Sequence, residues 1–328
     1  MSKTTTSTTL IKATGINRYY GNTHAVKNLE FELHTGDILG FLGPNGAGKS
    51  TSMQILSGSL APDAGQITIN GFDLVENPTQ AKQQLGYLPE QPPLYKELTV
   101  DEYLGYCAQL RKLDKNTIDS AISKAKQRCG LSDVGSKMIN NLSKGYQQRV
   151  GIAQAIIHSP AVIILDEPTV GLDPIQIQEI RQLITELGEE HGIILSTHIL
   201  PEVQAVCNRV QIIQQGELVY HNDMQSINAE SQSSQTDFCF REKVNTQLFD
   251  SIDGVENIEI LDNESLRISF STDNSKADNA HRQLLKIVNE QSWTLLSMLP
   301  KTRSLEQIFI ELTTNENSAS TESTESAT

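Results

Sequence analysis

The chain has 328 residues, enough for one large domain or two ordinary ones. Its 26 Lys and Arg against 40 Asp and Glu give a net charge of −14, which argues against non-specific nucleic-acid binding. The longest apolar runs, over residues 162–165 and 192–195, are too short to cross a membrane. Residues 1–224 hold 18 basic and 23 acidic side chains and residues 225–328 hold 8 and 17, so the excess acidity of the last third indicates a domain boundary.

Short β-branched runs alternate with helical patterns along the first two thirds of the chain. The Ser/Thr-rich residues 1–9 predict a disordered N-terminus. We expect strands over 10–16, 26–33, 37–42, 66–70, 161–165 and 192–196. We expect helices over 50–56, 143–158 and 174–190. Residues 99–129 also look helical, and Thr99 and Glu102 at their start are predicted to form a capping box. The continuous apolar runs 161–165 and 192–196 are typical of parallel strands covered on both faces, so the pattern predicts an α/β core.

The pattern changes after a polar, Ser/Gln-rich segment over 226–236, which we interpret as a linker. Strands are expected over 237–241, 255–261, 266–271 and 293–299, with helices over 243–250 and 277–291. This βαββαβ order predicts a small α+β accessory domain of ferredoxin-like type over 237–313. Residues 314–328 are acidic and lack large apolar side chains, which predicts a disordered tail.

The strongest motif is Gly-Pro-Asn-Gly-Ala-Gly-Lys-Ser over 43–50, which matches G-x-x-x-x-G-K-[ST] between a predicted strand and a predicted helix. Glycines let backbone N–H groups approach phosphate oxygens at the N-terminus of a helix. Lys49 would reach the β- and γ-phosphates, and the Ser50 hydroxyl would bind Mg²⁺. The residues predicted to hold the nucleotide here are Gly43, Pro44, Asn45, Gly46, Ala47, Gly48, Lys49, Ser50 and Thr51.

Two carboxylates follow the predicted strand 161–165, at the end of the sheet where open α/β proteins bind ligands. Asp166 is predicted to hold Mg²⁺, and Glu167 to act as the general base for water that attacks the γ-phosphate. Without the phosphate loop, the same two residues would be interpreted as solvated carboxylates at a strand end.

Residues 142–147, Leu-Ser-Lys-Gly-Tyr-Gln, begin the predicted helix 143–158 with Ser143 as a candidate N-cap. A capped helix end offers a hydroxyl, free N–H groups and the positive end of the helix dipole, so it is a second candidate anion site. Taken alone it would be an ordinary capped helix. Its place just upstream of the carboxylate strand favours a functional role.

These motifs, followed by Gly-Leu-Asp-Pro at 171–174 and Ser-Thr-His at 196–198, resemble the ATP-binding subunit of an ABC transporter over about residues 10–225. The segment 142–174 is most similar to ATPases that serve ABC-2-type permeases, such as exporter, drug and gliding-motility systems. Residues 304–309 are similar to the end of the accessory domain in that branch. The resemblance implies a P-loop ABC-type nucleotide-binding domain with an antiparallel β subdomain and a helical subdomain at about 90–155.

The resemblance also implies functional roles. Tyr20 would stack on adenine, Ser143 and Gly145 would bind the γ-phosphate of ATP held by the opposite subunit, and Asp173 would lie at the subunit interface. His198 would contact the γ-phosphate and help to hold the attacking water. Taken alone, Tyr20 could be a half-buried surface aromatic and His198 a structural histidine.

As partners, the resemblance implies ATP and Mg²⁺, a second copy of the chain in an ATP-bound homodimer, and a transmembrane permease that is a separate chain. Nucleic acid is not expected as a partner. The protein would be cytoplasmic and peripheral on the inner face of the membrane. The resemblance also implies that the chain hydrolyses ATP and that this hydrolysis drives transport in the export direction.

Three residues depart from the family pattern. Glu90 occupies a position that is usually Gln, and in the family the residue at this position contacts Mg²⁺ and links to the permease. Lys144 and Tyr146 stand where Gly and Gln are commonest. Ser143 and Gly145 are retained, so a working second half-site is still expected. The alternative is a soluble ABC-type ATPase that acts on nucleic acid or ribosomes; such relatives usually show a coiled-coil insertion, paired nucleotide domains or basic patches, none of which is visible here.

Overall fold

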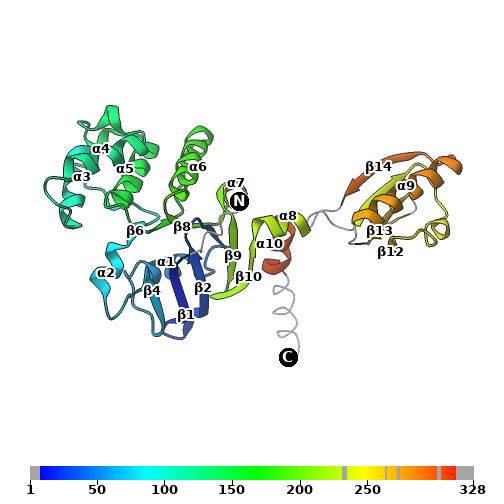
Figure 1. Cartoon of the computed structure of the whole chain (residues 1–328), viewed down its shortest axis with the longest axis horizontal. Coiled ribbons are helices and arrows are strands. Elements are labelled where there is room, and N and C mark those ends of the chain that lie inside the picture. The colour runs from blue at the N-terminus through cyan, green and yellow to red at the C-terminus, as the bar shows by residue number, and fades with distance from the viewer. Residues whose placement is uncertain (1–7, 231–234, 263, 272–273, 301–303, 315–328) are drawn as a thin grey trace, which may run out of the picture. The chain divides into compact units, whose positions relative to one another are not determined.

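The computed structural model describes residues 8–230, 235–262, 264–271, 274–300 and 304–314. The chain divides into two compact units, one within Met1–Met224 and the other over Gln225–Thr314 (Figure 1). Within the described ranges, no helix is long and apolar enough to cross a bilayer.

The first unit contains an antiparallel sheet built around a long hairpin. Its order is β2 (Thr23–His34), β1 (Thr9–Tyr20), β4 (Ala64–Ile69) and β5 (Phe72–Asp73). Strand β1 begins at Thr9, which pairs with His34, so the prediction of disorder over 1–9 was wrong at this end; residues 1–7 lie outside the described residues. The two β-branched runs are longer than predicted because they pair with each other as far as the turn at Gly21.

The second sheet of this unit contains the predicted strands 37–42, 161–165 and 192–196 as β3, β7 and β8, together with three strands that were not predicted. Its order is β10 (Glu217–Asp223), β9 (Arg209–Gln214), β3 (Ile38–Leu42), β8 (Gly192–Thr197), β7 (Val162–Asp166) and β6 (Leu85–Leu88). Only β10 runs antiparallel to its neighbour among these strands. Every residue of β3, β7 and β8 is buried, as expected for strands covered on both faces.

Helices cover both faces of the parallel sheet. Helix α1 (Lys49–Leu56) lies between the two sheets, where Met53 and Leu56 share one apolar core with β1, β2, β3 and β7. Helices α6 (Pro174–Gly188) and α7 (Leu200–Val206) pack on the opposite face. A side chain at Gly40 of β3 would lie 2.7 Å from Val203, so glycine permits the close approach of α7.

A group of helices lies beyond β6 (Figure 1). The elements of this region are α2 (Pro78–Gln83), α3 (Val100–Leu110), α4 (Ile118–Arg128), the 3₁₀ turns η1 (Ser132–Val134) and η2 (Ile139–Asn141), and α5 (Lys144–Ile156). The predicted capping box is present: the Thr99 side chain accepts from Glu102 N, and the Glu102 carboxylate accepts from Thr99 N. The helical stretch 99–129 is interrupted between α3 and α4, where Lys112 has a φ of 57°.

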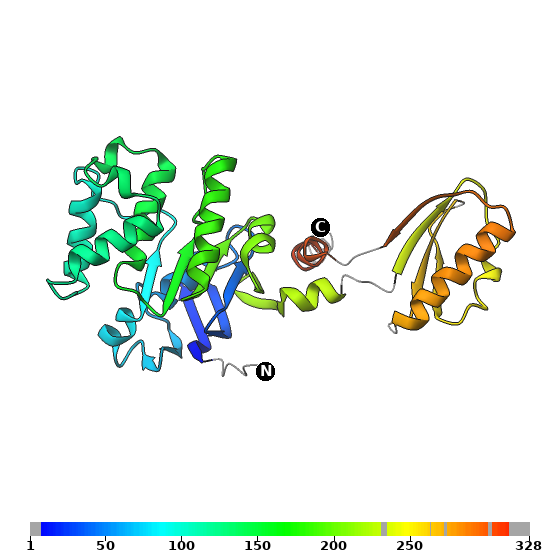
Figure 2. The same ribbon diagram turned by 45° about the horizontal axis from the view of Figure 1, so that its top comes forward.

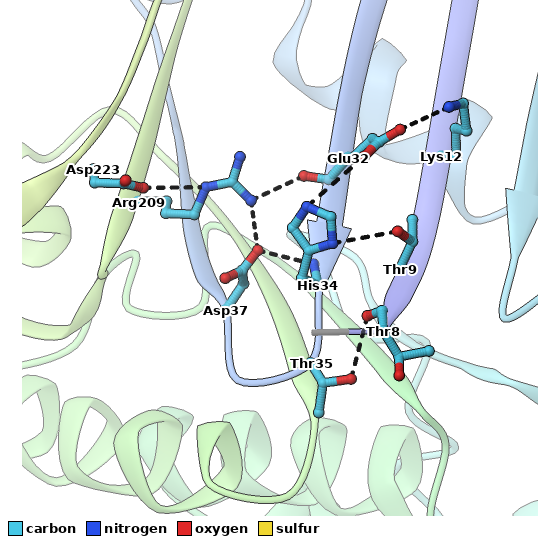
Figure 3. Close-up of polar contacts among 9 residues, drawn as sticks. All are labelled: Thr8, Thr9, Lys12, Glu32, His34, Thr35, Asp37, Arg209 and Asp223. Atoms are coloured by element: carbon cyan, nitrogen blue, oxygen red, sulfur yellow. Dashed lines mark hydrogen bonds and ion pairs between the residues drawn. The ribbon is translucent and has the colours of Figure 1, made fainter. Parts of the chain in front are cut away.

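A polar network ties the edges of the two sheets together (Figure 3). Arg209 of β9 donates to Asp37 at 2.5 Å and to the backbone oxygen of Glu32 at 3.1 Å. Asp37 also accepts from His34 N at 2.8 Å, and Glu32 pairs with Lys12 at 2.7 Å. These contacts fix the start of β3 against the antiparallel sheet.

The second unit contains a four-stranded antiparallel sheet with α9 (Asn274–Glu290) along one face (Figure 2). Its order is β12 (Val255–Ile260), β13 (Ser265–Phe270), β11 (Gln235–Phe240) and β14 (Leu295–Pro300). Numbered within the unit, this is the 2-3-1-4 order that the ferredoxin-like prediction requires. Its core contains the buried rings of Phe238, Phe240, Phe249 and Phe270 together with α9 side chains. Helices α8 (Met224–Glu230) and α10 (Leu305–Thr314) complete the described unit.

Two sequence expectations in this unit were wrong. Residues 243–250 do not form a helix: only the short turn η3 (Thr246–Leu248) is present, because the Asn245 side chain accepts from Gln247 N and favours a turn in a segment too short to propagate a helix. The linker predicted over 226–236 contains the end of α8 and the start of β11; its residues 231–234 lie outside the described residues. The predicted tail, 314–328, lies outside them except for Thr314, the last residue of α10.

Candidate functional site

The candidate site lies at the carboxyl edge of the parallel sheet. Strands β3, β6, β7 and β8 run in one direction, so the loops that follow them meet at one edge. These loops bring the phosphate-loop motif, Glu90, Glu167 and His198 around a cavity of about 620 Å³. The predicted site residues that line it are Tyr20, Asn45, Gly46, Gly48, Lys49, Ser50, Thr51, Glu90, Glu167 and His198.

The phosphate loop owes its shape to its glycines. Gly48 has a φ of 103° and is the N-cap of α1, and a side chain there would meet the Ala25 oxygen at 2.6 Å. A side chain at Gly43 would lie 2.4 Å from the Ile213 oxygen. Gly46 has a φ of 80°. These positions leave no room for a Cβ or require the left-handed backbone, so the loop can turn tightly into the N-terminus of a helix.

Lys49 is almost fully buried under this loop. Its ammonium donates to the Gly43 oxygen at 2.8 Å and to the Pro44 oxygen at 3.2 Å, and lies 3.9 Å from Glu167 Oε1. Burial lowers the pKa of Lys49, whereas the carboxylates of Glu167, Asp166 and Glu90 act in the opposite direction. The loop therefore holds one cation at the bottom of the cavity.

The charges of three carboxylates, Glu167, Asp166 and Glu90, act on the Lys49 ammonium. Asp166 is 2% exposed, and its Oδ1 is buried without a hydrogen-bond partner. Burial raises the pKa of Asp166, and the negative charges of Glu167 and Glu90 raise it further. An unpaired buried oxygen and an excess of carboxylates both fit a divalent cation beside Ser50. Mg²⁺ commonly binds one or two carboxylates together with phosphates and water, which agrees with this donor set.

Glu167 and His198 contact each other directly. His198 Nδ1 lies 2.9 Å from Glu167 Oε1 and 3.0 Å from Oε2. Glu167 has a φ of 49°, a left-handed conformation that is uncommon for a residue with a side chain. Its backbone N–H donates to the Ser196 oxygen at 2.9 Å, so the chain turns sharply where β7 ends. The turn directs the carboxylate into the cavity while the backbone stays tied to β8.

Tyr20 lies at the end of β1 and is 47% exposed. The Arg18 guanidinium lies 5.1 Å from the centre of its ring. Next to it, the rings of Tyr19 and His24 stack with their centres 3.9 Å apart. The cavity lined by the phosphate loop thus also has an aromatic side chain, that of Tyr20, in its wall.

Seven further lining residues were not predicted: Thr23, His24, Ala25, Lys27, Val170, Gln215 and Gly216. Four of them belong to the first part of β2, and Gln215 and Gly216 form the turn between β9 and β10. Gln215 and Gly216 have φ values of 47° and 84°, and Gly216 N donates to the Ala47 oxygen at 2.9 Å. Gln-Gly between two apolar runs is compatible with a tight turn, but nothing in it indicates contact with a loop about 170 residues away.

Ser143, Gly145 and Asp173 do not lie in this cavity. They line a separate cavity of about 480 Å³ together with Tyr146, Arg149 and Gln176. Ser143 is the N-cap of α5, as predicted, and accepts from Tyr146 N. Asp173 is the N-cap of α6 and accepts from Ile175 N and Gln176 N, each at 3.0 Å. Within one chain, the phosphate loop and the signature segment are therefore two different sites.

A phosphate loop before a helix, an Asp-Glu pair where β7 ends, and a histidine directly after β8 define a P-loop nucleotide-binding protein. Residues 26–170 match the family model described as ABC transporter. The ABC transporter ATP-binding protein NatA of Bacillus subtilis (strain 168) is 36% identical over 222 residues, 67% of this chain and 90% of that protein. The linearmycin resistance ATP-binding protein LnrL of the same organism is 29% identical over 316 residues, 93% of this chain and 98% of that protein.

Among solved structures, cbiO1 from Clostridium perfringens, described as part of the ABC transporter complex cbiONQ, is similar with a TM-score of 0.62 and 30% identity. The match covers 68% of this chain and 91% of that one. The chain belongs to the ABC transporter family as an ATP-binding subunit, and it is an ATPase. The predicted family and fold class are confirmed.

Proposed function

We propose that two copies of this chain close on two ATP molecules and thereby drive a separate membrane permease. The observation that carries this proposal is the separation of the two cavities: Lys49 and Ser143 belong to different sites of one chain. A triphosphate in the first cavity would have its γ-phosphate open to the signature segment of a second copy. ATP then joins the two copies, and hydrolysis removes the contacts that hold them closed.

Within the first cavity, each residue has a proposed task. The loop N–H groups and Lys49 bind the phosphates, and Tyr20 stacks on adenine. Ser50 would hold Mg²⁺ directly, and Asp166 and Glu90 would hold it directly or through water. Once bound, Mg²⁺ neutralises charge on the β- and γ-phosphates. The unpaired Oδ1 of Asp166 supports this assignment.

Glu167 is the proposed general base. A carboxylate at the cavity wall can accept a proton from water placed in line with the γ-phosphate. His198 lies within hydrogen-bond distance of Glu167 and also lines the cavity, which supports a role in holding that water and the γ-phosphate. From the second copy, Ser143 and Gly145 would bind the γ-phosphate, and Asp173 would lie at the interface.

The proposed permease surface lies on the helical region. Tyr95, Tyr106, Leu110 and Met138 are 41–64% exposed, which is high for large apolar side chains. The ring of Tyr95 makes edge-on contacts with Tyr106 at 5.6 Å and with Tyr103 at 6.2 Å. These aromatic groups lie on the segment that follows Glu90, so movement at the nucleotide could reach a membrane partner. Such a partner would place the chain on the inner face of the membrane.

Export by an ABC-2-type permease is the proposed direction of transport. The name of the relative LnrL, a linearmycin resistance protein that covers almost the whole of this chain, supports this choice. Isolation of the chain from membranes with its bound partners tests the proposal: an integral membrane protein is expected, whereas ribosomes or nucleic acid would support the alternative soluble ATPase.

Complementation between damaged subunits tests the shared site. Lys49→Ala damages the first cavity and Ser143→Arg the second, so each variant alone should lack ATPase activity. Mixed dimers of the two contain one intact composite site and should recover part of the turnover. Full activity of Ser143→Arg alone would contradict the shared site, because each chain would then hold a complete site.

A further inference from the structure

Glu202 is a buried carboxylate with no role in the chemistry described above. It lies in the first turn of α7 and is 1% exposed. Among the described residues, no cation lies within ion-pair distance of it. Its oxygens instead accept hydrogen bonds from two threonine hydroxyls: Oε1 from Thr169, and Oε2 from Thr197 at 2.8 Å. A buried carboxylate without a cation is costly, so a specific reason for its presence is expected.

The two threonines belong to the two loops that carry the proposed catalytic groups. Thr169 follows Glu167 by two residues, and Thr197 directly precedes His198. Backbone pairing between β7 and β8 ends at Asp166 and Ser196, and Glu167 then turns away with its left-handed φ. Beyond that point, the Glu202 carboxylate connects the two loops.

The directions of the hydrogen bonds are determined by the network itself. Ile199 N donates to Thr197 Oγ1 at 3.1 Å, so the Thr197 hydroxyl is free to donate to Glu202. A chain of hydrogen bonds therefore runs from the Ile199 amide through Thr197 to the carboxylate, and Thr169 approaches its other oxygen. A carboxylate can accept at both oxygens, whereas an amide can accept at only one.

We infer that Glu202 is a positioning residue that holds the Glu167 loop and the His198 loop in their catalytic arrangement. This inference rests on the proposed roles of Glu167 and His198. Because Glu202 acts through the two threonines, its loss should misplace the base relative to the γ-phosphate and leave the phosphate loop intact. A displacement of about 1 Å is enough to lower kcat about 100-fold.

The test measures kcat, KM and the equilibrium Kd for ATP in the full-length chain. Glu202→Ala removes the carboxylate, and Glu202→Gln removes one acceptor. Thr169→Val and Thr197→Val remove one hydroxyl each at nearly constant shape, whereas Thr169→Ser and Thr197→Ser keep it. The four threonine variants keep the test informative if Glu202→Ala fails to fold.

A matched control separates positioning from loss of stability. Asn208 lies near the start of β3, far from its carboxyl end, where it accepts from Ile38 N at 2.9 Å and donates to the Gly36 oxygen at 2.8 Å. Asn208→Ala should lower the Tm and leave kcat unchanged. Glu202→Ala should lower kcat about 10- to 100-fold with less than about threefold change in the Kd for ATP.

The threonine pairs give the sharpest readout. Each Val variant should lower kcat, each Ser variant should restore it, and Thr169→Val should add little to Glu202→Ala because both break the same connection. The inference is overturned if Glu202→Ala keeps the wild-type kcat, if the Ser variants are as impaired as the Val variants, or if Asn208→Ala lowers kcat equally.

Glu167→Gln, measured in parallel, distinguishes this inference from the proposed function. If Glu167→Gln is inactive while the Glu202 variants are normal, the base assignment stands and the role of Glu202 falls. If Glu167→Gln keeps its turnover, the base assignment falls, and positioning of that base by Glu202 falls with it.

Discussion

The two units of the chain bury different kinds of side chain. In the first unit, charged and hydroxyl side chains are buried at the carboxyl edge of the parallel sheet; they are Lys49, Asp166, Glu167, Thr169, Ser196, Thr197 and Glu202. Among the residues that the structure describes in the second unit, Thr236 is the one buried polar side chain. The core of that unit consists mainly of aromatic and aliphatic groups, with Phe238, Phe240 and Trp293 in ring contact.

This difference indicates where the chemistry is. Burial of polar groups costs free energy unless each group is paired, so a buried polar cluster persists where it serves a function. The first unit accepts that cost at one sheet edge and even leaves Asp166 Oδ1 unpaired. The second unit has a core of packed apolar groups, and its ion pairs, such as Arg267 with Asp237, involve partly exposed side chains. Substitutions in the buried polar cluster of the first unit should therefore change turnover, and substitutions in the aromatic core of the second unit should change stability.

The largest effect is expected from Glu167→Gln. The amide keeps the shape of the side chain but cannot accept the proton of the attacking water, so turnover should fall by about 100-fold or more. Binding of ATP should persist because the phosphate loop is unchanged, and an ATP-bound dimer should accumulate. ATPase assays together with size-exclusion chromatography in ATP provide the measurement. Turnover close to wild type would rule out Glu167 as the base.

Phe238→Ala tests whether the aromatic core of the second unit contributes to stability and not to ATP binding. Phe238 is fully buried and contacts Phe240 and Phe270, so truncation should destabilise the second unit by about 3–5 kcal/mol. Unfolding followed by Trp293 fluorescence reports on this unit, because Trp293 is the only tryptophan of the chain and contacts Phe240 and Phe249. The Kd for ATP should stay unchanged, and a large loss of ATP affinity would link the two units.

Lys49→Ala removes the ammonium beneath the phosphate loop. A charged hydrogen bond contributes about 1.5–3 kcal/mol, so ATP affinity should fall about 10- to 100-fold. Titration with a fluorescent ATP analogue measures this loss, and Lys82→Ala, in helix α2 of the same unit, is a control of equal charge change. Equal affinities of the two variants would exclude Lys49 from phosphate binding.

Most of the candidate site could be predicted from sequence because its residues follow strands in recognisable motifs. Parallel strands bring their carboxyl ends together, so Glu90, Glu167 and His198 gather near Lys49 whatever the loop details are. Strands β3, β7 and β8 were predicted because burial on both faces requires continuous apolar runs such as 161–165, whereas β6, β9 and β10 were not predicted.

What could not be predicted depends on contacts between distant residues. His24 reaches the cavity from the start of β2, and Gly216 reaches it from the turn between β9 and β10, and neither local sequence indicates that contact. Neither the helix α7 nor a role for Glu202 was predicted from the sequence, since only the tertiary packing of α7 buries Glu202 against Thr169 and Thr197. The helix expected over 243–250 failed for a local reason, because Asn245 stabilises a turn in place of the first helical turn.

A smaller effect should come from acid. Burial lowers the pKa of His158 to about 4, and its Nε2 lies 3.2 Å from the Leu85 oxygen. The folded pKa is depressed below the ordinary value of 6.5, so the unfolded chain binds the proton first as pH falls. Stability from this group is complete above about pH 6.5 and is lost between there and pH 4, by about 2 kcal/mol after allowance for solvent. Burial lowers the pKa of His191 in the same direction.

Denaturant unfolding at pH 7.5 and pH 5 measures this loss in wild type and in His158→Gln. The variant keeps a donor for Leu85 but cannot take up a proton, so its unfolding free energy should fall less between the two pH values. The same slope in both proteins would assign the acid sensitivity to other groups.

The smallest effect should come from removal of the second unit. Every residue placed at the phosphates and at the cation precedes residue 200, and the hairpin turn that touches the phosphate loop ends at Gly216. A chain that ends at Gln225 therefore keeps the whole cavity and the signature segment, and its parallel strands remain covered by α1, α6 and α7. Its Kd for ATP should lie within about threefold of the full-length value, because no phosphate contact is removed and one such bond would be worth a larger change. The loss should instead appear in dimerisation in the presence of ATP or in coupling to transport.

Isothermal titration of ATP into both chains compares their Kd values, and circular dichroism establishes that the truncated chain is folded. A folded truncated chain that fails to bind ATP would mean that the second unit supplies nucleotide contacts, and the division between a chemical and a packing unit would then be wrong.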